Sequence, residues 1–404
     1  MNINEQQTIR PHRKHSGQAD FANNEQRFLI IMDSLFTGGA EYSTLLWMDW
    51  LLAKGYDVRM VLLKPKNPSY KISDFKIDPS RVTMLNTKGV YARYKTLKQI
   101  IQDFKPAVVH SVLNASNFTT RALRILHGGF KHVESLVNQP YSQERLSDKS
   151  LNTFKIRLLQ MYDIRTQKKG VQHFHANSQA VADHYKHAVK VPANKITVIP
   201  RGRADNTYIH QKDTLRRQYE AEFNIPADYV WLINTGRHEY QKAHDVLLEA
   251  LSLLQSKVSY TLLIAGREGK ETSKIRQLID HYGLKDRVRL LGHRTDIPQL
   301  LAASDLFVFP SRYEGMPGAL IETCAAGLPS VCTDLPCMRE VVDETSARFF
   351  PLNGAKALSH QLDQILNDAS SRTDMGKEAL KQFQEKFRLE RIHERMLEVV
   401  GCRL

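Results

Sequence analysis

The chain has 404 residues, of which 42% are hydrophobic and 25% are charged, and this composition excludes a disordered or fibrous protein. Two domains are expected, because a single core rarely grows beyond about 250 to 300 residues. The net charge of +14 is unevenly placed: residues 1–210 hold 31 Lys and Arg against 16 Asp and Glu, whereas residues 211–404 hold 26 against 27. This excess predicts nucleic acid, an anionic membrane surface or an acidic substrate as partner; a basic domain that is merely soluble is the alternative.

The first 26 residues are polar and basic and lack the apolar stretch of a signal peptide, which predicts a disordered tail. No run of 18 apolar residues occurs. Four cysteines lie in the last quarter of the chain, and their spacing fits neither a zinc site nor a disulfide framework: Cys324, Cys332, Cys337 and Cys402. We therefore expect a cytoplasmic protein in a reducing compartment.

Short β-branched runs alternate with helical segments along the whole chain, which is typical of parallel sheets covered by helices on both faces. The predicted strands are Phe28–Met32, Val58–Leu63, Ala107–His110, His132–Val137, Gln172–Ala176, Ile196–Ile199, Tyr229–Thr235, Tyr260–Ala265, Val288–Leu291, Leu306–Phe309 and Ser330–Cys332. Stretches such as 42–54 and 245–254 carry the 3.6-residue periodicity of helices. The fold class is therefore α/β, with two doubly wound Rossmann-like domains.

The join between the domains is placed between Pro200 and Pro226, where Pro-Arg-Gly-Arg breaks the pattern. The predicted organisation is a tail (1–26), an N-terminal domain (27–210), a C-terminal domain (211–384) and a final helix (385–404) that packs back toward the N-terminal domain. Open α/β sheets bind ligands beyond the carboxyl ends of their strands, so a cleft between the two domains is the expected active site.

A glycine turn, Gly38 and Gly39, follows the first predicted strand and opens an amphipathic helix. Such a turn lets backbone N–H groups approach a phosphate. It is not a G-x-G-x-x-G motif, and no acidic residue at the right distance indicates dinucleotide binding. A plain tight turn is the alternative.

A second glycine, Gly236, ends a strand in the other half, and Arg237 and Lys242 follow before the next helix. Arginine offers a planar fork to phosphate oxygens and lysine a mobile point charge, so the pair could neutralise a diphosphate. Two solvated loop cations are the alternative. Gly266 and Gly292 end two further strands, which implies close backbone contacts there.

The most informative stretch runs from Phe309 to Pro329. A strand ends at Phe309, a turn carries Glu314 and Gly315, and Pro317 suits the first turn of the helix that holds Glu322. The helix start forms a site for an anion, and Glu314 and Glu322 can each accept two hydrogen bonds from sugar hydroxyls. Alternatively, Glu314 only caps the helix and Glu322 is a solvated helix residue.

These residues, taken together, resemble a known family. Ser311–Pro317 with Glu322 resembles the E-x7-E signature of retaining glycosyltransferases, specifically glycosyltransferase family 4, which folds as two Rossmann-like domains (the GT-B architecture). Further matches occur in the same order over residues 28 to 400: the Gly38–Glu41 turn, Asn177–Ser178, Val198–Gly202, Gly236 and Arg237 with Lys242, and Leu291–Asp296.

The resemblance implies roles for these residues. Arg237 and Lys242 correspond to the catalytic pair that grips the donor diphosphate, and Glu314 to the glutamate that faces the donor sugar. Glu322 corresponds to the residue that binds the ribose. Further substrate-binding positions are the backbone of Gly38, Gly39, Gly236 and Gly266, the backbone of Gly315, Met316 and Pro317, and His293 or Arg294 at the nucleobase. Family members use a nucleotide sugar, retain the anomeric configuration and need no metal; the sequence has no DxD-type motif.

One position departs from the family pattern. Many relatives carry a histidine near the sugar where this chain has Asn138 and Gln139, which can hydrogen-bond a hydroxyl but cannot titrate. His110, at the end of an earlier strand, is an alternative, although a core histidine fits equally well. Asn138 is therefore predicted to bind substrate, and the acceptor-side catalytic residue stays open.

A basic amphipathic segment, 145–169, places Leu151, Phe154, Leu158, Met161, Tyr162 and Arg165 at helical spacing. Its other positions include Lys149, Lys155, Arg157, Lys168 and Lys169. Such helices lie on anionic membranes; a core-packed helix with a charged outer face is the alternative. Nucleic acid is disfavoured, because no recognisable module interleaves these cations with exposed aromatic residues.

The sequence thus predicts a metal-independent, retaining hexosyltransferase without a cofactor, with a UDP-sugar as the expected donor. The acceptor is a glycan or lipid-linked acceptor of cell-surface polysaccharide or glycolipid synthesis. Peripheral attachment to the inner face of the cytoplasmic membrane is a further expectation. A nucleotide-sugar epimerase of the same architecture and a non-catalytic sugar-nucleotide-binding subunit are the rivals.

Overall fold

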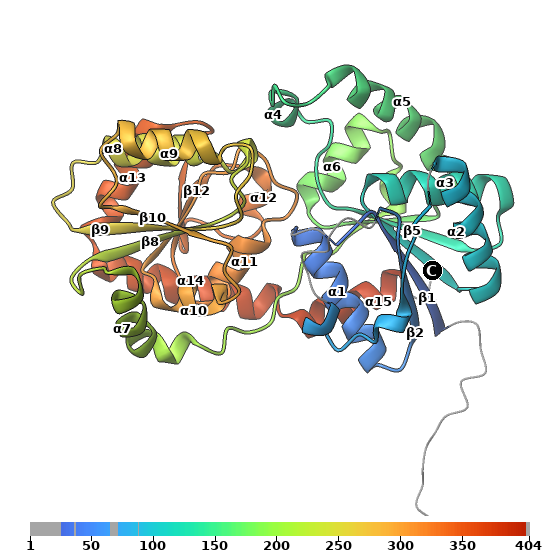
Figure 1. The fold of residues 1–404 in the computed structure, drawn as a ribbon, viewed down its shortest axis with the longest axis horizontal. Helices are drawn as coiled ribbons and strands as arrows, with labels where there is room; N and C mark the ends of the chain where they lie inside the picture. The colour runs from blue at the N-terminus through green and yellow to red at the C-terminus, as the bar shows by residue number, and fades with distance from the viewer. Residues whose placement is uncertain (1–25, 36–37, 65–71, 88, 401–404) are drawn as a thin grey trace, which may run out of the picture.

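The computed structural model describes residues 26–35, 38–64, 72–87 and 89–400. These residues form two domains that lie side by side, each a parallel sheet covered by helices on both faces (Figure 1). The predicted α/β class with two doubly wound sheets is confirmed. Of the predicted tail, 1–26, only Gln26 belongs to the described residues.

Seven parallel strands form the sheet of the N-terminal domain, in the order β3-β2-β1-β4-β5-β6-β7. Along β1, Phe28 and Ile30 join one apolar cluster, while Leu29 and Ile31 join another on the opposite face. Successive side chains of a strand point to opposite faces, so β1 is apolar throughout because both faces are covered. The strands are β1 (Arg27–Met32), β2 (Asp57–Leu62), β3 (Val82–Met84), β4 (Val108–Val112), β5 (Lys131–Leu136), β6 (His173–Ala176) and β7 (Ile196–Val198).

Six helices precede the linker to the second domain: α1 (Gly39–Ala53), α2 (Val90–Phe104), α3 (Asn114–His127), α4 (Gln143–Leu146), α5 (Thr153–Gly170) and α6 (Gln179–Ala188). Among the described residues, no helix is both long enough and apolar enough to cross a bilayer.

Helix α5 buries polar residues and exposes apolar ones. It packs on α3, where the buried Asp163 accepts a 2.5 Å bond from Arg121 Nη1. Phe154 and Leu158, on another side of the helix, are 71% and 50% exposed. The buried ion pair thus orients α5 so that its apolar residues stay outside the core, unlike the core-packed helix considered from the sequence.

The C-terminal domain contains a six-stranded parallel sheet in the order β10-β9-β8-β11-β12-β13. Trp231 and Ile233 of β8 pack on one face and Leu232 on the other. The strands are β8 (Val230–Thr235), β9 (Tyr260–Ala265), β10 (Val288–Gly292), β11 (Leu306–Phe309), β12 (Ser330–Thr333) and β13 (Ala347–Phe350). The helices are α7 (Lys212–Phe223), α8 (His244–Ser252), α9 (Thr272–His281), α10 (Ile297–Ala303), α11 (Gly318–Ala325), α12 (Pro336–Arg339), α13 (Ala355–Leu366), α14 (Ala369–Lys386) and α15 (Leu389–Val400).

All the predicted strands are present, with bounds that differ by one or two residues. The sequence analysis missed two strands, β3 and β13, each the outermost strand of its sheet. Both are short, and β3 exposes Thr83 and Met84. An edge strand of three or four residues leaves no long apolar run, and it was therefore invisible to a search for buried strands.

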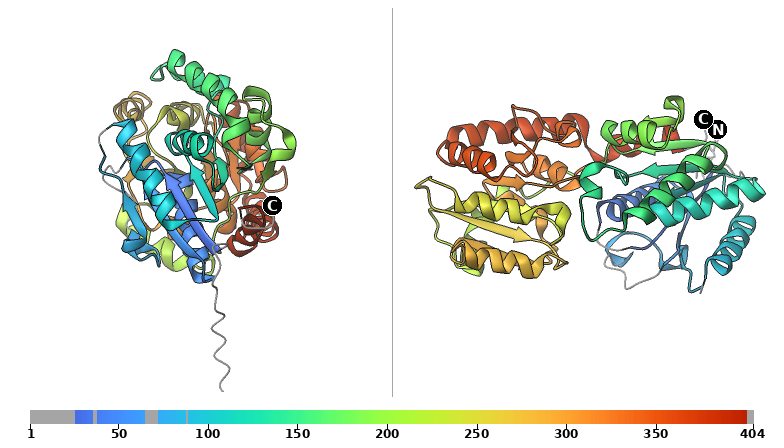
Figure 2. Two further views of the ribbon diagram at one scale, coloured as in Figure 1. Left: turned by 90° about the vertical axis from the view of Figure 1, so that its right-hand side faces the viewer. Right: turned by 90° about the horizontal axis from the view of Figure 1, so that it is seen from above.

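The chain passes between the domains twice, once before α7 and once between α14 and α15 (Figure 2). The two passes are paired, because Arg203 N donates to Phe387 O (2.9 Å) and Leu389 N donates to Arg203 O (2.9 Å). Helix α15 then packs on the N-terminal domain, where Ile392 joins the apolar cluster beneath β1. Trp50 Nε1 also donates to Glu390 Oε2 over 2.7 Å.

Three buried histidines make the fold sensitive to acid. Burial lowers the pKa of His110, His132 and His244 to about 3, from an ordinary value of 6.5. Below pH 6.5 the unfolded chain binds protons that the folded chain does not, so the free energy of unfolding should fall by about 1.4 kcal/mol per pH unit for each histidine. Urea denaturation near neutral pH and at about pH 5 tests this; equal unfolding free energies at the two pH values would contradict it.

Candidate active site

Three glycines end neighbouring strands of the C-terminal sheet at its carboxyl edge. Gly236 N donates to Ala265 O (3.0 Å), and Gly266 N donates to Gly292 O (2.8 Å), so the ends of β8, β9 and β10 are bonded side by side. A Cβ on Gly266 would overlap the carbonyl oxygen of Gly236. Only glycine fits there, and the structure places both Gly236 and Gly266 at the edge predicted from the sequence.

Lys242 and Glu314 meet at this edge from different loops. Lys242 belongs to a short 3-10 turn (Tyr240–Lys242) before α8, and Glu314 lies in the loop between β11 and α11. Their ion pair spans 2.6 Å, and their side chains are 17% and 11% exposed. The ammonium also lies 4.9 Å from the ring centre of Phe309. Lys242 therefore holds a fixed position beside the carboxylate that the resemblance assigns to the donor sugar.

Arg312 fastens these two loops together. Its guanidinium donates to Tyr240 O (2.7 Å), to both carboxylate oxygens of Asp245 (3.0 Å each) and to Asn353 Oδ1 (2.8 Å). The residue is only 7% exposed, and a buried, fully bonded guanidinium restrains each partner it touches. Arg312 thus sets the relative position of Lys242 and Glu314.

The loop that carries Glu314 also contacts the N-terminal domain. Gly315 O accepts a 2.8 Å bond from Ser178 Oγ, and Glu314 O accepts one from Gln139 Nε2 (3.3 Å). A Cβ on Gly315 would overlap Val137 O. The two domains therefore touch backbone to backbone at this loop.

Met316 and Pro317, which were also predicted to bind substrate through their backbone, hold the loop in place with their side chains. Met316 is buried in the core of the C-terminal domain, and Pro317 is the N-cap of α11. Their backbone stays in the loop, while their side chains anchor it.

Glu322, the fifth residue of α11, is bound by an arginine from the linker. Arg203 Nε donates to Glu322 Oε1 over 2.6 Å, and its Nη1 donates to Ser43 Oγ of α1 over 3.1 Å. Arg203 is 4% exposed and lies over the ring of Tyr42. Arg203 therefore links Glu322 of α11 to Ser43 of α1.

On the N-terminal side, the predicted glycine turn faces the same region. A Cβ on Gly39 would overlap a guanidinium nitrogen of Arg201, and one on Gly38 would overlap the Glu41 carboxylate. Burial raises the pKa of Glu41, while Arg237 and Arg201 act against that effect. Arg237, from the other domain, thus lies within electrostatic reach of the tip of α1.

Asn138 lies in a small pocket of about 200 Å³ at the carboxyl edge of the N-terminal sheet. Polar residues dominate its wall, including Asp33, Asn114 and Ser135. Asn117, which is 4% exposed, also lines it, and its Oδ1 has no hydrogen-bond partner among the described residues. A buried unpaired acceptor is costly, so this wall suits a ligand with hydroxyl groups.

The remaining predicted residues have different surroundings. Arg294 pairs with Asp296 (2.5 Å) and with Glu222 of α7 (2.7 Å), and these bonds raise its pKa. His293 beside it is exposed at the end of β10. His110 is buried, and its Nε2 lies 2.8 Å from Ser135 Oγ, so it is a hydrogen-bonded core residue.

The sequence analysis named Ser178 and the Val198–Gly202 segment, which contains Arg201, as family matches but gave neither Ser178 nor Arg201 a role, and it gave none to Arg203. Pro-Arg-Gly-Arg was otherwise used only to place the join between the domains. Its position directly after β7 was the available signal, because the carboxyl end of a parallel strand is where side chains reach a ligand.

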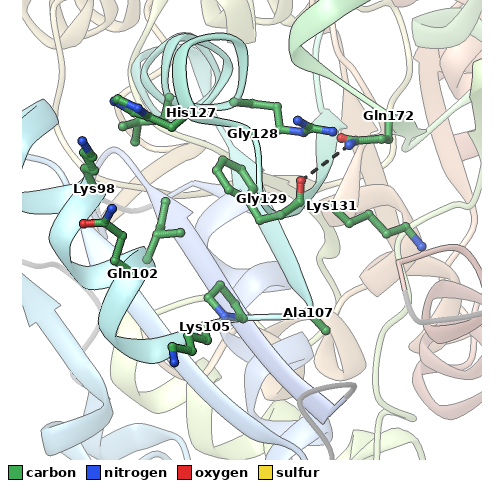
Figure 3. Close-up of a pocket in the computed structure, with 14 residues that line it drawn as sticks. Lys98, Gln102, Lys105, Ala107, His127, Gly128, Gly129, Lys131 and Gln172 are labelled. Atoms are coloured by element: carbon green, nitrogen blue, oxygen red, sulfur yellow. Dashed lines mark hydrogen bonds between the residues drawn. The ribbon is translucent and has the colours of Figure 1, made fainter.

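A larger cavity, of about 790 Å³, lies at the opposite edge of the N-terminal sheet, between the C-terminal ends of α2 and α3 (Figure 3). Lys98, Lys105, Arg124 and Lys131 line it, and none of its fourteen lining residues is acidic. It is separate from the cleft and adds to the positive charge of this domain.

Two facing Rossmann-like domains, with the Glu314 loop in contact with both, form the GT-B architecture. The family described as Glycosyl transferases group 1 matches residues 216–382, and Glycosyltransferase Family 4 matches residues 37–205. The chain therefore belongs to the group 1 glycosyl transferases of glycosyltransferase family 4, as the resemblance predicted.

Similar curated proteins include the O-antigen chain mannosyltransferase B of Escherichia coli, 32% identical over 46% of this chain and 47% of that protein. The N-acetyl-alpha-D-glucosaminyl L-malate synthase of Bacillus anthracis is 28% identical over 43% of this chain and 46% of that protein. The matched segment thus spans about half the length of these relatives.

Solved structures share the fold at low identity. Anabaena HepE in complex with UDP-glucose superposes with a TM-score of 0.79 at 17% identity, covering 92% of this chain and 98% of that one. WaaG, a glycosyltransferase involved in lipopolysaccharide biosynthesis, gives a TM-score of 0.73 at 18% identity, covering 92% and 99%.

Proposed function

We propose that this glycosyltransferase moves a hexose from a UDP-sugar to a glycan or lipid-linked acceptor, with retention of anomeric configuration and without a metal ion. The observation that carries the proposal is the buried Lys242–Glu314 pair, at the edge where β8 and β11 end and the other domain touches the loop. A cation beside a carboxylate suits a ligand in which a phosphate is joined to a sugar.

The charges of the cleft fit this reaction. Glycosyl transfer passes through an oxocarbenium-like state, and negative charge grows on the departing diphosphate. Lys242, which is held by Glu314, and the exposed Arg237 are the cations that can stabilise that charge. Glu322 has oxygens that can accept from ribose hydroxyls. We infer a front-face attack, in which the leaving phosphate takes the proton of the acceptor hydroxyl.

The N-terminal pocket around Asn138 is the proposed acceptor site. Its polar wall and the unpaired Asn117 oxygen suit a sugar ring, and the pocket lies beyond the carboxyl end of β5, at the start of the segment that meets the Glu314 loop. The names of several relatives point to O-antigen and lipopolysaccharide synthesis, which supports an acceptor of the cell envelope.

A peripheral place on the inner face of the cytoplasmic membrane is part of the proposal. Helix α5 exposes Phe154, Leu158 and Met161, and its five Lys and Arg residues are exposed while its single acid, Asp163, is buried. The acid-free cavity between α2 and α3 adds further positive charge. Apolar side chains among cations are what an anionic lipid surface binds.

The double variant Phe154→Ser with Leu158→Ser should lose membrane binding. The wild-type protein should float with vesicles that contain anionic lipid and stay behind with neutral ones, because each surface cation adds about 1 kcal/mol. Removal of two apolar side chains should abolish flotation and leave nucleotide binding unchanged, since neither residue lies in the cleft. Equal recovery with anionic and neutral vesicles would argue against docking.

The proposed activity is tested with a panel of nucleotide sugars. Thermal shift should select one donor, because a ligand at 100 times its Kd adds about 2.7 kcal/mol of stability. Release of nucleoside diphosphate from that donor should then depend on a lipid-linked or glycan acceptor. Release without acceptor, or conversion of the donor to its epimer, would favour the epimerase, and binding without turnover would favour a non-catalytic subunit.

A further inference from the structure

Four cations lie around the cleft, and only two of them have a carboxylate partner. Lys242 pairs with Glu314 and Arg203 with Glu322. Neither Arg201 nor Arg237 has a carboxylate of the described residues within 4.0 Å. The two unpaired cations come from different domains' segments, since Arg237 follows β8 and Arg201 follows β7.

Arg201 lies at the tip of α1. One of its guanidinium nitrogens occupies the space beside Gly39 that a Cβ would need. Its charged neighbours include Glu41 on α1, Glu314 on the opposite loop, and Arg203. Arg201 therefore lies beside the glycine turn of the N-terminal domain, within electrostatic reach of Glu314 and Glu322 of the C-terminal domain.

The position of Arg201 is costly for the protein without a ligand. The residue is half-buried, and Arg203 is two positions away with a like charge. Burial, with a further effect of Arg203, lowers the pKa of Arg201 to about 10, so the guanidinium is still charged at neutral pH. A partly desolvated cation beside another cation gains most from an anion with more than one negative charge.

We propose that Arg201 is a third cationic ligand of the donor, binding the β-phosphate of the nucleoside diphosphate from the side opposite Arg237 and Lys242. The inference rests on the proposed function. The β-phosphate carries the sugar, and Arg201 is the linker cation whose neighbours include the sugar-facing Glu314. The diphosphate is then held by cations from both sides of the cleft.

Arg203 has a different task in this arrangement. Its nitrogens already bind Glu322, Ser43 and Gly202 O, and its plane covers Tyr42. It acts as a positioning residue for Glu322 and so for the ribose. Replacement of the two arginines of this Arg-Gly-Arg segment should therefore affect nucleotide binding in different ways, so each variant serves as a comparison for the other.

The experiment measures the affinities of UDP and UMP by titration calorimetry for the wild-type protein, Arg201→Gln, Arg201→Lys and Arg203→Gln. If UDP does not bind, UDP and UMP are replaced by another nucleoside diphosphate and its monophosphate. The replacement is the one whose nucleotide sugar binds in the panel. Arg201→Gln should weaken the binding of UDP by about ten- to a hundredfold, which is the effect of one hydrogen bond to a charged group. The affinity for UMP should change little. Arg203→Gln should weaken both nucleotides by a similar factor. Arg276→Gln, an exposed arginine of α9, is the matched control.

Each outcome decides a separate question. A wild-type protein that binds no nucleoside diphosphate overturns the proposed function. If the wild-type protein binds UDP, and Arg201→Gln has the same ratio of UDP affinity to UMP affinity as the wild-type protein, only the role of Arg201 is overturned. If Arg201→Gln misfolds and so loses UMP binding as well, Arg201→Lys decides. Its ratio of UDP affinity to UMP affinity should lie between the wild-type ratio and one. A ratio equal to that of the wild-type protein refutes the proposal.

Discussion

Replacement of Lys242 or Arg237 by alanine lowers kcat by about 10² to 10³-fold, the effect of removing one fixed donor from a charge that develops in the transition state. The donor is already charged in the ground state, so its Kd should change by less than kcat does. Lys242→Ala also leaves Glu314 without its 2.6 Å partner, and it should be the more damaging of the two. Single-turnover kinetics, with enzyme in excess over the donor, measures the rate constant of the chemical step separately from product release, and this rate constant should fall by the same factor.

The control for these variants is Lys285→Ala, a surface lysine whose side chain is 70% exposed and whose partner is Asp280 on α9. It removes the same charge from the same domain far from the cleft, and its kcat should match that of the wild-type protein. Near-normal turnover of either cleft variant would exclude the proposed charge stabilisation.

Gly315→Ala should reduce turnover about as strongly. The added methyl group would overlap Val137 O, a backbone atom of the other domain. Since neither backbone can yield cheaply, the loop and the N-terminal domain must separate, and the Ser178 bond to Gly315 O is lost. We expect kcat to fall by about two orders of magnitude, the cost of misplacing reacting groups by about an ångström.

Gly318→Ala is the matched comparison. Its methyl group would meet the end of the Arg203 side chain, which can move, rather than backbone. The loss should therefore be smaller than for Gly315→Ala, while both proteins should melt near the wild-type temperature because both sheets keep their cores. A Gly315→Ala enzyme with wild-type kcat would show that contact between the domains at this loop is not needed.

The sequence was sufficient for the parts of the fold that depend on local pattern. Buried strands such as Phe28–Met32 are continuous apolar runs, and they were placed to within a residue or two. Edge strands β3 and β13 were not found, because they are short and partly exposed. The sequence left open whether the apolar side of α5 packs in the core or faces outward, since the choice depends on an ion pair between Asp163 and the distant Arg121.

The candidate site follows the same division. Gly236, Lys242, Glu314 and Glu322 stand in local motifs with a known order along the chain. The structure places Gly236 beside Lys242, Lys242 against Glu314, and Glu322 against Arg203. The environment of each residue needed three dimensions. Arg203 binds Glu322 across 119 positions, and Arg312 binds Asp245 across 67. A search for local motifs along the sequence cannot reveal partners that lie so far apart in it.

The paired crossings at Arg203 and at Phe387–Leu389 act as a two-stranded hinge. Two backbone hydrogen bonds tie the crossings at a single point, so any opening of the cleft must turn about an axis close to Arg203. The same side chain grips Glu322 on one domain and Ser43 on the other. Nucleotide occupancy and the swing of the domains should therefore be mechanically coupled at the pivot itself.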